Sequence, residues 1–155
     1  MSVAFRRDCD EEHLEPKFER PIPPGPNLVT AAGLAEIEAR IGALEAAVAG
    51  ESDEARLAEA KRDLRYWRSR LRTAQLAPTP SGDAAGFGSR VRFRLKGAEQ
   101  ILRIVGVDEA DPAQGRIAFS APLARALMGG VAGDQVDFAG EPDAIEIVEI
   151  VQDEG

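Results

Sequence analysis

Residues 102–130, LRIVGVDEADPAQGRIAFSAPLARALMGG, change their hydrophobic pattern several times over a short distance. LRIVGV and RIAFS are short apolar runs typical of strands, and the acidic, proline and glycine residues of DEADPAQG between them predict a turn. PLARALMGG predicts a short helix, because proline suits a first helical turn and glycine suits the position after a helix ends. This succession indicates a small α+β domain.

Further strand patterns flank this stretch on both sides. SRVRFRL, residues 89–95, alternates arginine with apolar side chains, which is typical of a strand with one solvated face. The downstream runs QVDF and AIEIVEI predict two more strands. We therefore expect residues 87–152 to form one antiparallel sheet packed by one short helix.

Residues 30–77 have a different periodicity, which predicts two antiparallel helices. Thr30 suits an N-cap, Gly50 interrupts the pattern, and Ser52 suits a second N-cap. Apolar residues at spacings of three and four form one narrow stripe on each helix: Leu34, Ile37, Ile41, Leu44 and Val48, then Leu57, Ala60, Leu64, Trp67, Leu71 and Ala74. The two stripes can only bury each other, in a coiled-coil hairpin with its turn near residues 49–53. At about 1.5 Å per residue this arm is on the order of 30 Å long.

Two segments lack such periodicity. Residues 1–29 are polar and rich in proline, as in PKFERPIPPGPN, and we expect an irregular or disordered leader. Residues 78–86, PTPSGDAAG, have the composition of a linker that ends the second helix at Pro78. The predicted order is leader, helical hairpin, linker and α+β domain.

The composition argues against several classes of protein. With 27 acidic and 19 basic residues the net charge is −8, which disfavours sequence-specific DNA binding and attachment to anionic membranes. A single histidine, His13, and a single cysteine, Cys9, cannot supply a zinc site or a catalytic triad, so we expect no catalysis by the chain alone. No apolar run is long enough to cross a bilayer, and we expect a soluble cytoplasmic protein.

The segment 102–130, followed by VAGDQVDF and IEIVEI, resembles the C-terminal domain of the bacterial GreA/GreB transcript-cleavage factors. LVTAAGLAEIEARI, residues 28–41, resembles the first helix of the same family. The resemblance implies an FKBP-like domain that docks at the secondary channel of bacterial RNA polymerase, while the hairpin enters the channel. A member of this family is not itself an enzyme. It stimulates the polymerase to cleave backtracked RNA and so restarts stalled complexes.

The resemblance also implies a role for the hairpin turn, AGESDEARLAEAK. In the family, acidic residues at the tip help to hold a second Mg²⁺ at the polymerase active site, and carboxylates suit this ion. The later tip acid falls on Asp53 and the earlier one on Gly50, with Glu51 adjacent as a substitute. The alternative is that Glu51, Asp53 and Glu54 only favour the start of a helix.

Two further sets of residues follow from the comparison. The polymerase-facing surface implied by the resemblance consists of Asp108, Glu109, Asp111, Ser120 and Pro122. The alternative for the acidic members is a turn capped by its own side chains.

The second set lies on the second predicted helix, where residues 61–72 contain six Lys or Arg and one Asp. Arg65, Arg68 and Arg72 are candidates to contact the channel or the 3′ end of the nascent RNA. Tyr66 and Arg70 also lie off the apolar stripe, whereas Trp67 lies on it. The alternative is a solvated helix face with ion pairs between successive turns.

Two rival functions stay open at this point. The first helix is shorter than is usual for Gre factors, which resembles the Rnk-like proteins that bind the polymerase without stimulating cleavage. An FKBP-like domain also suggests a prolyl isomerase, but residues 87–155 contain only four aromatic residues to form both a core and a proline pocket.

Overall fold

The computed structural model describes residues 19–77 and 83–151, and no helix among them is long and apolar enough to span a membrane. The chain divides into two compact units. The first contains Glu36–Thr73 together with the described residues up to Gly25, and the second contains Pro26–Ala35 and the described residues from Ala74 onward.

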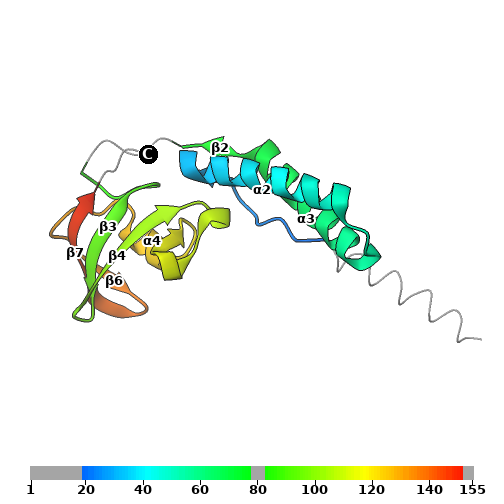
Figure 1. Ribbon diagram of the computed structural model, residues 1–155. Helices are drawn as coiled ribbons and strands as arrows, with labels where there is room; N and C mark the ends of the chain where they lie inside the picture. Colours follow the sequence, from blue (N-terminus) through cyan, green and yellow to red (C-terminus); the bar gives the residue numbers. More distant parts are fainter. Residues whose placement is uncertain (1–18, 78–82, 152–155) are drawn as a thin grey trace, which may run out of the picture. The chain divides into compact units, whose positions relative to one another are not determined.

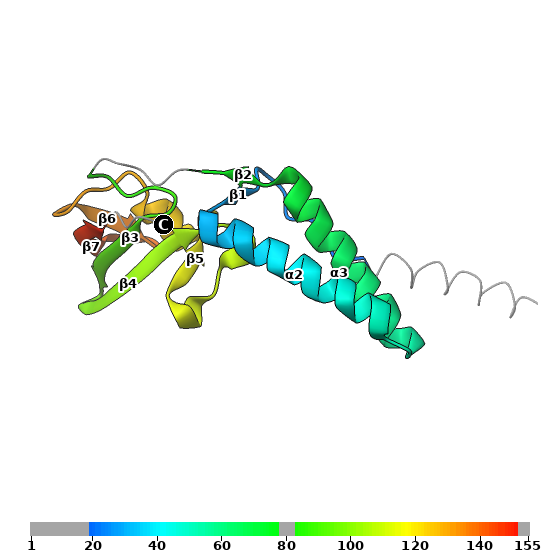
Figure 2. The ribbon, with the colours of Figure 1, turned by 45° about the horizontal axis from the view of Figure 1, so that its top comes forward.

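The first unit is built on the predicted helical hairpin. Helices α2 (Ala31–Gly50) and α3 (Glu54–Thr73) lie side by side (Figures 1 and 2). Ile37, Leu64 and Trp67 are almost fully buried, as the apolar stripes predict. The stripe prediction is wrong at its end, because Leu71 is 36% exposed and Ala74 lies beyond the helix.

The helix boundaries follow from local hydrogen bonds. The Thr30 hydroxyl accepts a hydrogen bond from the Gly33 N–H at 3.0 Å, which confirms the predicted N-cap of α2. The second N-cap is Asp53 rather than Ser52, since Asp53 Oδ2 accepts a hydrogen bond from the Arg56 N–H at 2.9 Å. Both helices contain 20 residues, so each is about 30 Å long.

Two short strands, one just before α2 and the other just after α3 in the chain, pair as a parallel sheet. Strands β1 (Leu28–Val29) and β2 (Gln75–Leu76) are joined by hydrogen bonds from the Gln75 N–H to the Asn27 carbonyl and from the Ala77 N–H to the Val29 carbonyl. The expectation of an irregular leader through residue 29 is therefore wrong at its C-terminal end. The same pairing explains why α3 ends before Pro78, because residues in strand β2 cannot also continue a helix.

The second unit also contains a five-stranded sheet in the order β5-β4-β3-β7-β6, whose strands are labelled in Figures 1 and 2. Its elements are β3 (Arg90–Leu95), β4 (Ala98–Val105), η1 (Val107–Glu109), η2 (Pro112–Gln114), β5 (Arg116–Ala118), α4 (Pro122–Leu127), β6 (Gln135–Phe138) and β7 (Glu141–Val151). The predicted α+β class is confirmed, but the sheet is not wholly antiparallel, because β5 pairs with β4 in parallel.

Two tight turns and one apolar face organise this sheet. The turn Lys96–Gly97 joins β3 to β4, and the turn Ala139–Gly140 joins β6 to β7. Both residues of each turn have positive φ, a geometry that matches the twist of paired strands. Val91 and Phe93 of β3 are fully buried in the core with residues of α4, while the arginines that alternate with them lie on the opposite face, as the sequence pattern predicts.

Candidate functional site

The tip of the hairpin places the two predicted metal-binding carboxylates in one short turn. Glu51 Oε2 accepts a hydrogen bond from the Asp53 N–H at 3.0 Å, and Asp53 Oδ2 caps α3 through the Arg56 N–H. One oxygen of each carboxylate therefore accepts a hydrogen bond within the turn itself, which fits the alternative that these acids favour the start of a helix. Gly50, at the position of the earlier tip acid, ends α2 and contributes no side chain.

The donor set of the tip fits a shared metal ion better than a self-sufficient site. Within residues 19–77 and 83–151 no group of three or more His, Cys, Asp or Glu side chains is arranged to hold an ion. Mg²⁺ is commonly held by one or two carboxylates that act together with water and phosphate oxygens supplied from elsewhere. Glu51 and Asp53 match this partial set.

The predicted docking acids do not have equivalent environments. Asp108 and Asp111 are half-buried, and the Asp111 carboxylate lies 3.8 Å from the Arg116 guanidinium. Glu109 is only 6% exposed. Its carboxylate accepts hydrogen bonds from the hydroxyl and the N–H of Thr30 and from the N–H of Gly106. In this structure Glu109 thus has an internal role, and its assignment to the docking surface is not supported.

Two glycines allow Glu109 to reach this position. A Cβ added at Gly33 would lie 2.1 Å from the Glu109 carboxyl carbon, and one at Gly106 would lie 2.3 Å from the Leu28 carbonyl oxygen. Side chains at either position would therefore prevent the close approach of η1, β1 and the first turn of α2. The sequence signal for this contact is a glycine inside an otherwise regular helical pattern, TAAGLAE, but the partner cannot be read from the spacing.

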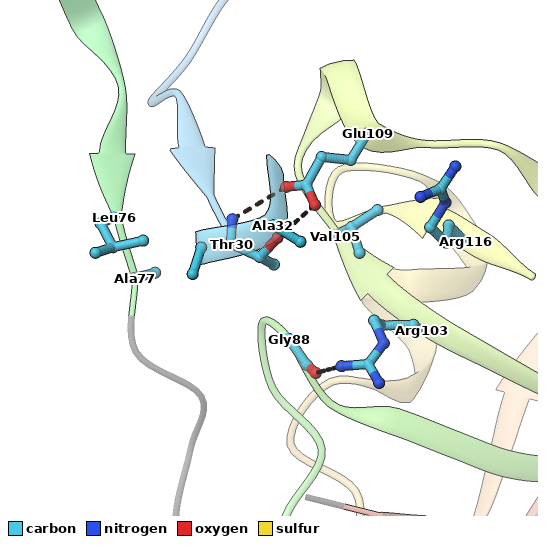
Figure 3. A pocket seen from close by; sticks show the side chains of 10 residues that line it. Thr30, Ala32, Leu76, Ala77, Gly88, Arg103, Val105, Glu109 and Arg116 are labelled. Carbon is cyan, nitrogen blue, oxygen red and sulfur yellow. Dashed lines mark hydrogen bonds between the residues drawn. The ribbon is translucent and has the colours of Figure 1, made fainter. Parts of the chain in front are cut away.

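A cavity of about 370 Å³ lies beside this contact in the second unit (Figure 3). Arg103 and Arg116 line it together with Thr30 and Glu109, and the Arg103 guanidinium donates a hydrogen bond to the Gly88 carbonyl at 3.1 Å. The start of a helix attracts anions through its unpaired N–H groups. Here the Glu109 carboxylate already lies at that end of α2, where it accepts hydrogen bonds from the N–H and hydroxyl of Thr30.

The remaining docking residues lie at the start of α4. Ser120 and Pro122 are exposed, and Pro122 occupies the first turn, where its missing N–H costs no helical hydrogen bond. Ala121, between them, is the N-cap and makes no side-chain cap. Leu127 of the same helix is fully buried, whereas the neighbouring Met128 is 38% exposed. Ser120 and Pro122 are therefore available for contact.

The basic side chains of α3 are less free than the sequence suggests. The guanidinium of Arg65 contacts the Glu19 carboxylate, with its Nε 3.1 Å from Oε1, and Arg68 pairs with Glu45 of α2 at 2.9 Å. Arg72 is exposed, and its guanidinium donates a hydrogen bond to the Ser69 hydroxyl at 3.5 Å. Thus one of the three candidate contact residues is free of an ion pair among the described residues.

The structure corrects the prediction that Tyr66 and Arg70, which lie off the apolar stripe, are exposed on the contact face of α3. Tyr66 is 7% exposed and Arg70 is 2% exposed, so neither is available at the surface. For Tyr66 the cause is a residue that precedes the helices, because the Arg20 guanidinium covers its ring at 3.9 Å from the centroid and also pairs with Asp63 at 3.6 Å. Sequence periodicity could not reveal a segment that packs on the second side of the helix.

The Glu19–Arg65 pair affects the protonation of both groups. The hydrogen bond from Arg65 holds the pKa of Glu19 below its ordinary value, and the same bond raises the pKa of Arg65. Both side chains are more than half exposed, so the pair contributes orientation more than stability.

The arginines of β3 form a second basic row, which is neutralised by its neighbours. Arg92 lies 3.4 Å from Glu149, and Arg94 lies 3.1 Å from Glu146, both on β7. Opposite charges on adjacent strands stabilise the pairing and reduce the local positive field. This row is therefore a weak candidate for binding RNA.

Comparison with known proteins identifies relatives of the C-terminal part of the chain. The family described as "Transcription elongation factor, GreA/GreB, C-term" matches residues 79–152. Transcription elongation factor GreB of Neisseria meningitidis serogroup A is 36% identical over 100 residues, which cover 62% of this chain and 61% of that protein. Transcription elongation factor GreA of Sinorhizobium medicae is 42% identical over 74 residues, which cover 45% of this chain and 47% of that protein.

The chain spans between about half and three fifths of the length of these curated relatives. Among solved structures, a GreA/GreB elongation factor from Nitrosomonas europaea is 21% identical and has a TM-score of 0.39, with 83% of this chain and 99% of that chain covered.

Proposed function

Because this chain belongs to the GreA/GreB transcription elongation factor family through its C-terminal domain, we propose that it binds bacterial RNA polymerase at the secondary channel and promotes cleavage of backtracked RNA. The match over residues 79–152 is the observation on which the proposal rests. In this scheme the second unit docks on the polymerase, and the helical hairpin is presented to the channel.

The docking surface consists of Asp108, Asp111, Ser120 and Pro122. The exposed Pro122 offers a flat apolar face, and the exposed Ser120 hydroxyl offers a hydrogen bond beside it. Asp108 and Asp111 add negative charge for a basic or polar partner surface. Contacts of this mixed kind, with an apolar centre and polar surroundings, are typical of protein interfaces.

The hairpin tip is the part that would act at the polymerase active site. Glu51 and Asp53 would hold the Mg²⁺ that is shared with the polymerase, which supplies the remaining ligands and the reaction itself. A second metal activates water or stabilises the leaving oxygen during hydrolysis of the RNA. The chain's own contribution is to orient these two carboxylates, and the turn does so through the hydrogen bonds that each makes to a backbone N–H.

The basic side of α3 supplies a secondary contact. Arg72, with Arg65 and Arg68 when their ion pairs open, would attract the phosphates of the RNA 3′ segment. Because Arg65 and Arg68 already have carboxylate partners, this contact is expected to be weaker than the charge of residues 61–72 suggests.

A cleavage assay on a stalled, backtracked elongation complex tests the proposal. The protein should accelerate release of the 3′ RNA fragment, and Asp53→Asn should remove most of this acceleration. Asparagine caps helices as well as aspartate does, so this variant removes the charge and keeps the turn. Glu54→Gln, in the same turn but outside these two hydrogen bonds, is the matched control and should retain the activity.

The main alternative is an Rnk-like protein that occupies the channel without stimulating cleavage. Gly50 at the earlier tip position and helices of 20 residues favour this reading. It predicts polymerase binding, no acceleration of cleavage and inhibition of a genuine Gre factor added to the same complex. Failure to bind polymerase at all would reject both functions.

A further inference from the structure

An apolar groove on the first unit has a basic rim. Its volume is about 470 Å³, and it lies where the C-terminal half of α2 meets α3. The residues that line it are Glu45, Val48, Ala49, Lys61, Leu64, Arg65 and Arg68. Three of these are basic and one is acidic, so the groove combines an apolar floor with a net positive edge. An occupant should therefore offer an apolar side chain flanked by carboxylates.

The described chain begins beside this groove. Glu19 contacts the guanidinium of Arg65, which is itself a rim residue. Arg20 continues the contact along α3 by covering Tyr66 and pairing with Asp63. The polypeptide that precedes Glu19 therefore starts at the edge of the groove.

The sequence before Glu19 has the chemistry that the groove requires. Residues 8–15, DCDEEHLE, contain five acidic residues, no lysine or arginine, and one large apolar residue, Leu14. The basic residues that line the groove are Lys61, Arg65 and Arg68 of α3. Glu19 lies eleven positions after Asp8, a length of chain that can span up to roughly 36 Å, whereas the rim from Lys61 to Arg68 is only about 10 Å long.

We propose that residues 8–15 of this chain dock in the groove, with Leu14 over its apolar floor and the flanking carboxylates against Lys61 and Arg65. Such docking covers the basic side of α3 with an internal competitor for any acidic or phosphate-bearing partner. Salt screens exposed ion pairs, so the segment is expected to leave the groove as ionic strength rises. The docking itself does not depend on the proposed function, and only its regulatory consequence does.

The single cysteine provides a direct test, because Cys9 lies within the acidic segment. A nitroxide attached to Cys9 of the full chain should broaden the backbone amide signals of Val48, Ala49 and residues 61–68 in an NMR spectrum. Reduction of the nitroxide supplies the diamagnetic reference. A mixture of isotope-labelled protein without nitroxide and unlabelled protein with nitroxide separates contacts within one chain from contacts between copies.

Two matched variants make the result decisive. Lys61→Glu and the triple change Asp10→Lys, Glu11→Lys and Glu12→Lys should each reduce the broadening at the groove by at least half. Arg56→Glu makes the same charge reversal on an exposed position of α3 that does not line the groove, and it should leave the broadening unchanged. An unaltered amide spectrum away from each substitution verifies that the variants are folded.

Three results would overturn the proposal. The first is broadening that only declines with distance along the chain from residue 9, and the second is broadening centred on the arginines of β3. The third is broadening that occurs only in the mixed sample, which would assign the groove to a second copy. If docking holds but the triple variant binds RNA or polymerase no more tightly than the original chain, only the regulatory consequence is rejected.

Discussion

Glu109 accepts a hydrogen bond from the Thr30 N–H at 3.0 Å, although 79 positions separate the two residues in the chain. Its carboxylate also receives the Thr30 hydroxyl and the Gly106 N–H, so it satisfies groups from the start of α2 and from the loop after β4. An acid of the DEADP motif thus holds the first turn of the hairpin's first helix within the second unit.

Loss of this carboxylate should destabilise the second unit. Glu109→Ala leaves three buried or half-buried donors without an acceptor, and we expect the free energy of unfolding to fall by about 2–3 kcal/mol. Urea unfolding followed by circular dichroism measures the change. Glu99→Ala removes only an exposed ion pair with Arg94 and should cost about 0.5 kcal/mol or less. Equal effects of the two changes would show that Glu109 has no special structural role.

Gly33 and Gly42 lie on the same helix, and we expect their replacement by alanine to change the stability of the protein in opposite directions. Alanine favours a helix interior over glycine by about 1 kcal/mol. At Gly42 nothing lies within 4 Å of the added Cβ, so Gly42→Ala should raise stability. At Gly33 the Cβ meets the Glu109 carboxyl, so Gly33→Ala should lower stability by about 1–3 kcal/mol despite the better propensity.

The comparison requires only the unfolding midpoints of the two glycine variants in the same buffer. Stabilisation by Gly33→Ala would mean that Glu109 can move away without loss. The hydrogen bonds to Thr30 would then contribute little to the fold.

The cap of α3 predicts a difference between two substitutions of one residue. Asp53→Ala removes the acceptor for the Arg56 N–H and should destabilise the hairpin by about 1 kcal/mol, whereas Asp53→Asn should change it little. Trp67 is the only tryptophan and is buried in this unit, so its fluorescence reports the unfolding of the hairpin directly. A loss of stability as large with asparagine as with alanine would contradict the capping role.

The Glu19–Arg65 contact predicts a dependence on acid pH. The pKa of Glu19 is lowered by its hydrogen bond with Arg65, so the contact is fully present above the ordinary value of 4.5 and is lost as pH falls through the lowered pKa. A carbon-detected NMR titration of the Glu19 carboxylate should give a midpoint below 4.5. The midpoint should rise in Arg65→Gln, and an unchanged midpoint in that variant would exclude the pair as its cause.

The periodicity of apolar residues in the sequence was sufficient to predict helices and strands whose geometry repeats over a few residues. The spacing of three and four residues predicted the buried stripe of Ile37, Leu64 and Trp67, and alternation predicted the two faces of β3. These patterns are reliable because each reflects one repeating geometry, either 3.6 residues per helical turn or two residues per strand repeat. The order of strand, turn and helix around residues 102–130 was likewise readable from its turn residues.

Only the tertiary structure determined where α3 ends and which polar side chains are buried. Pairing of β1 with β2 ends α3 at Thr73, packing of Arg20 buries Tyr66, and hydrogen bonds with Thr30 hold Glu109 inside the second unit. Each of these outcomes joins residues that are dozens of positions apart in the chain. Their formation depends on loop closure and on the burial of unpaired polar groups, neither of which leaves a repeating pattern in the sequence.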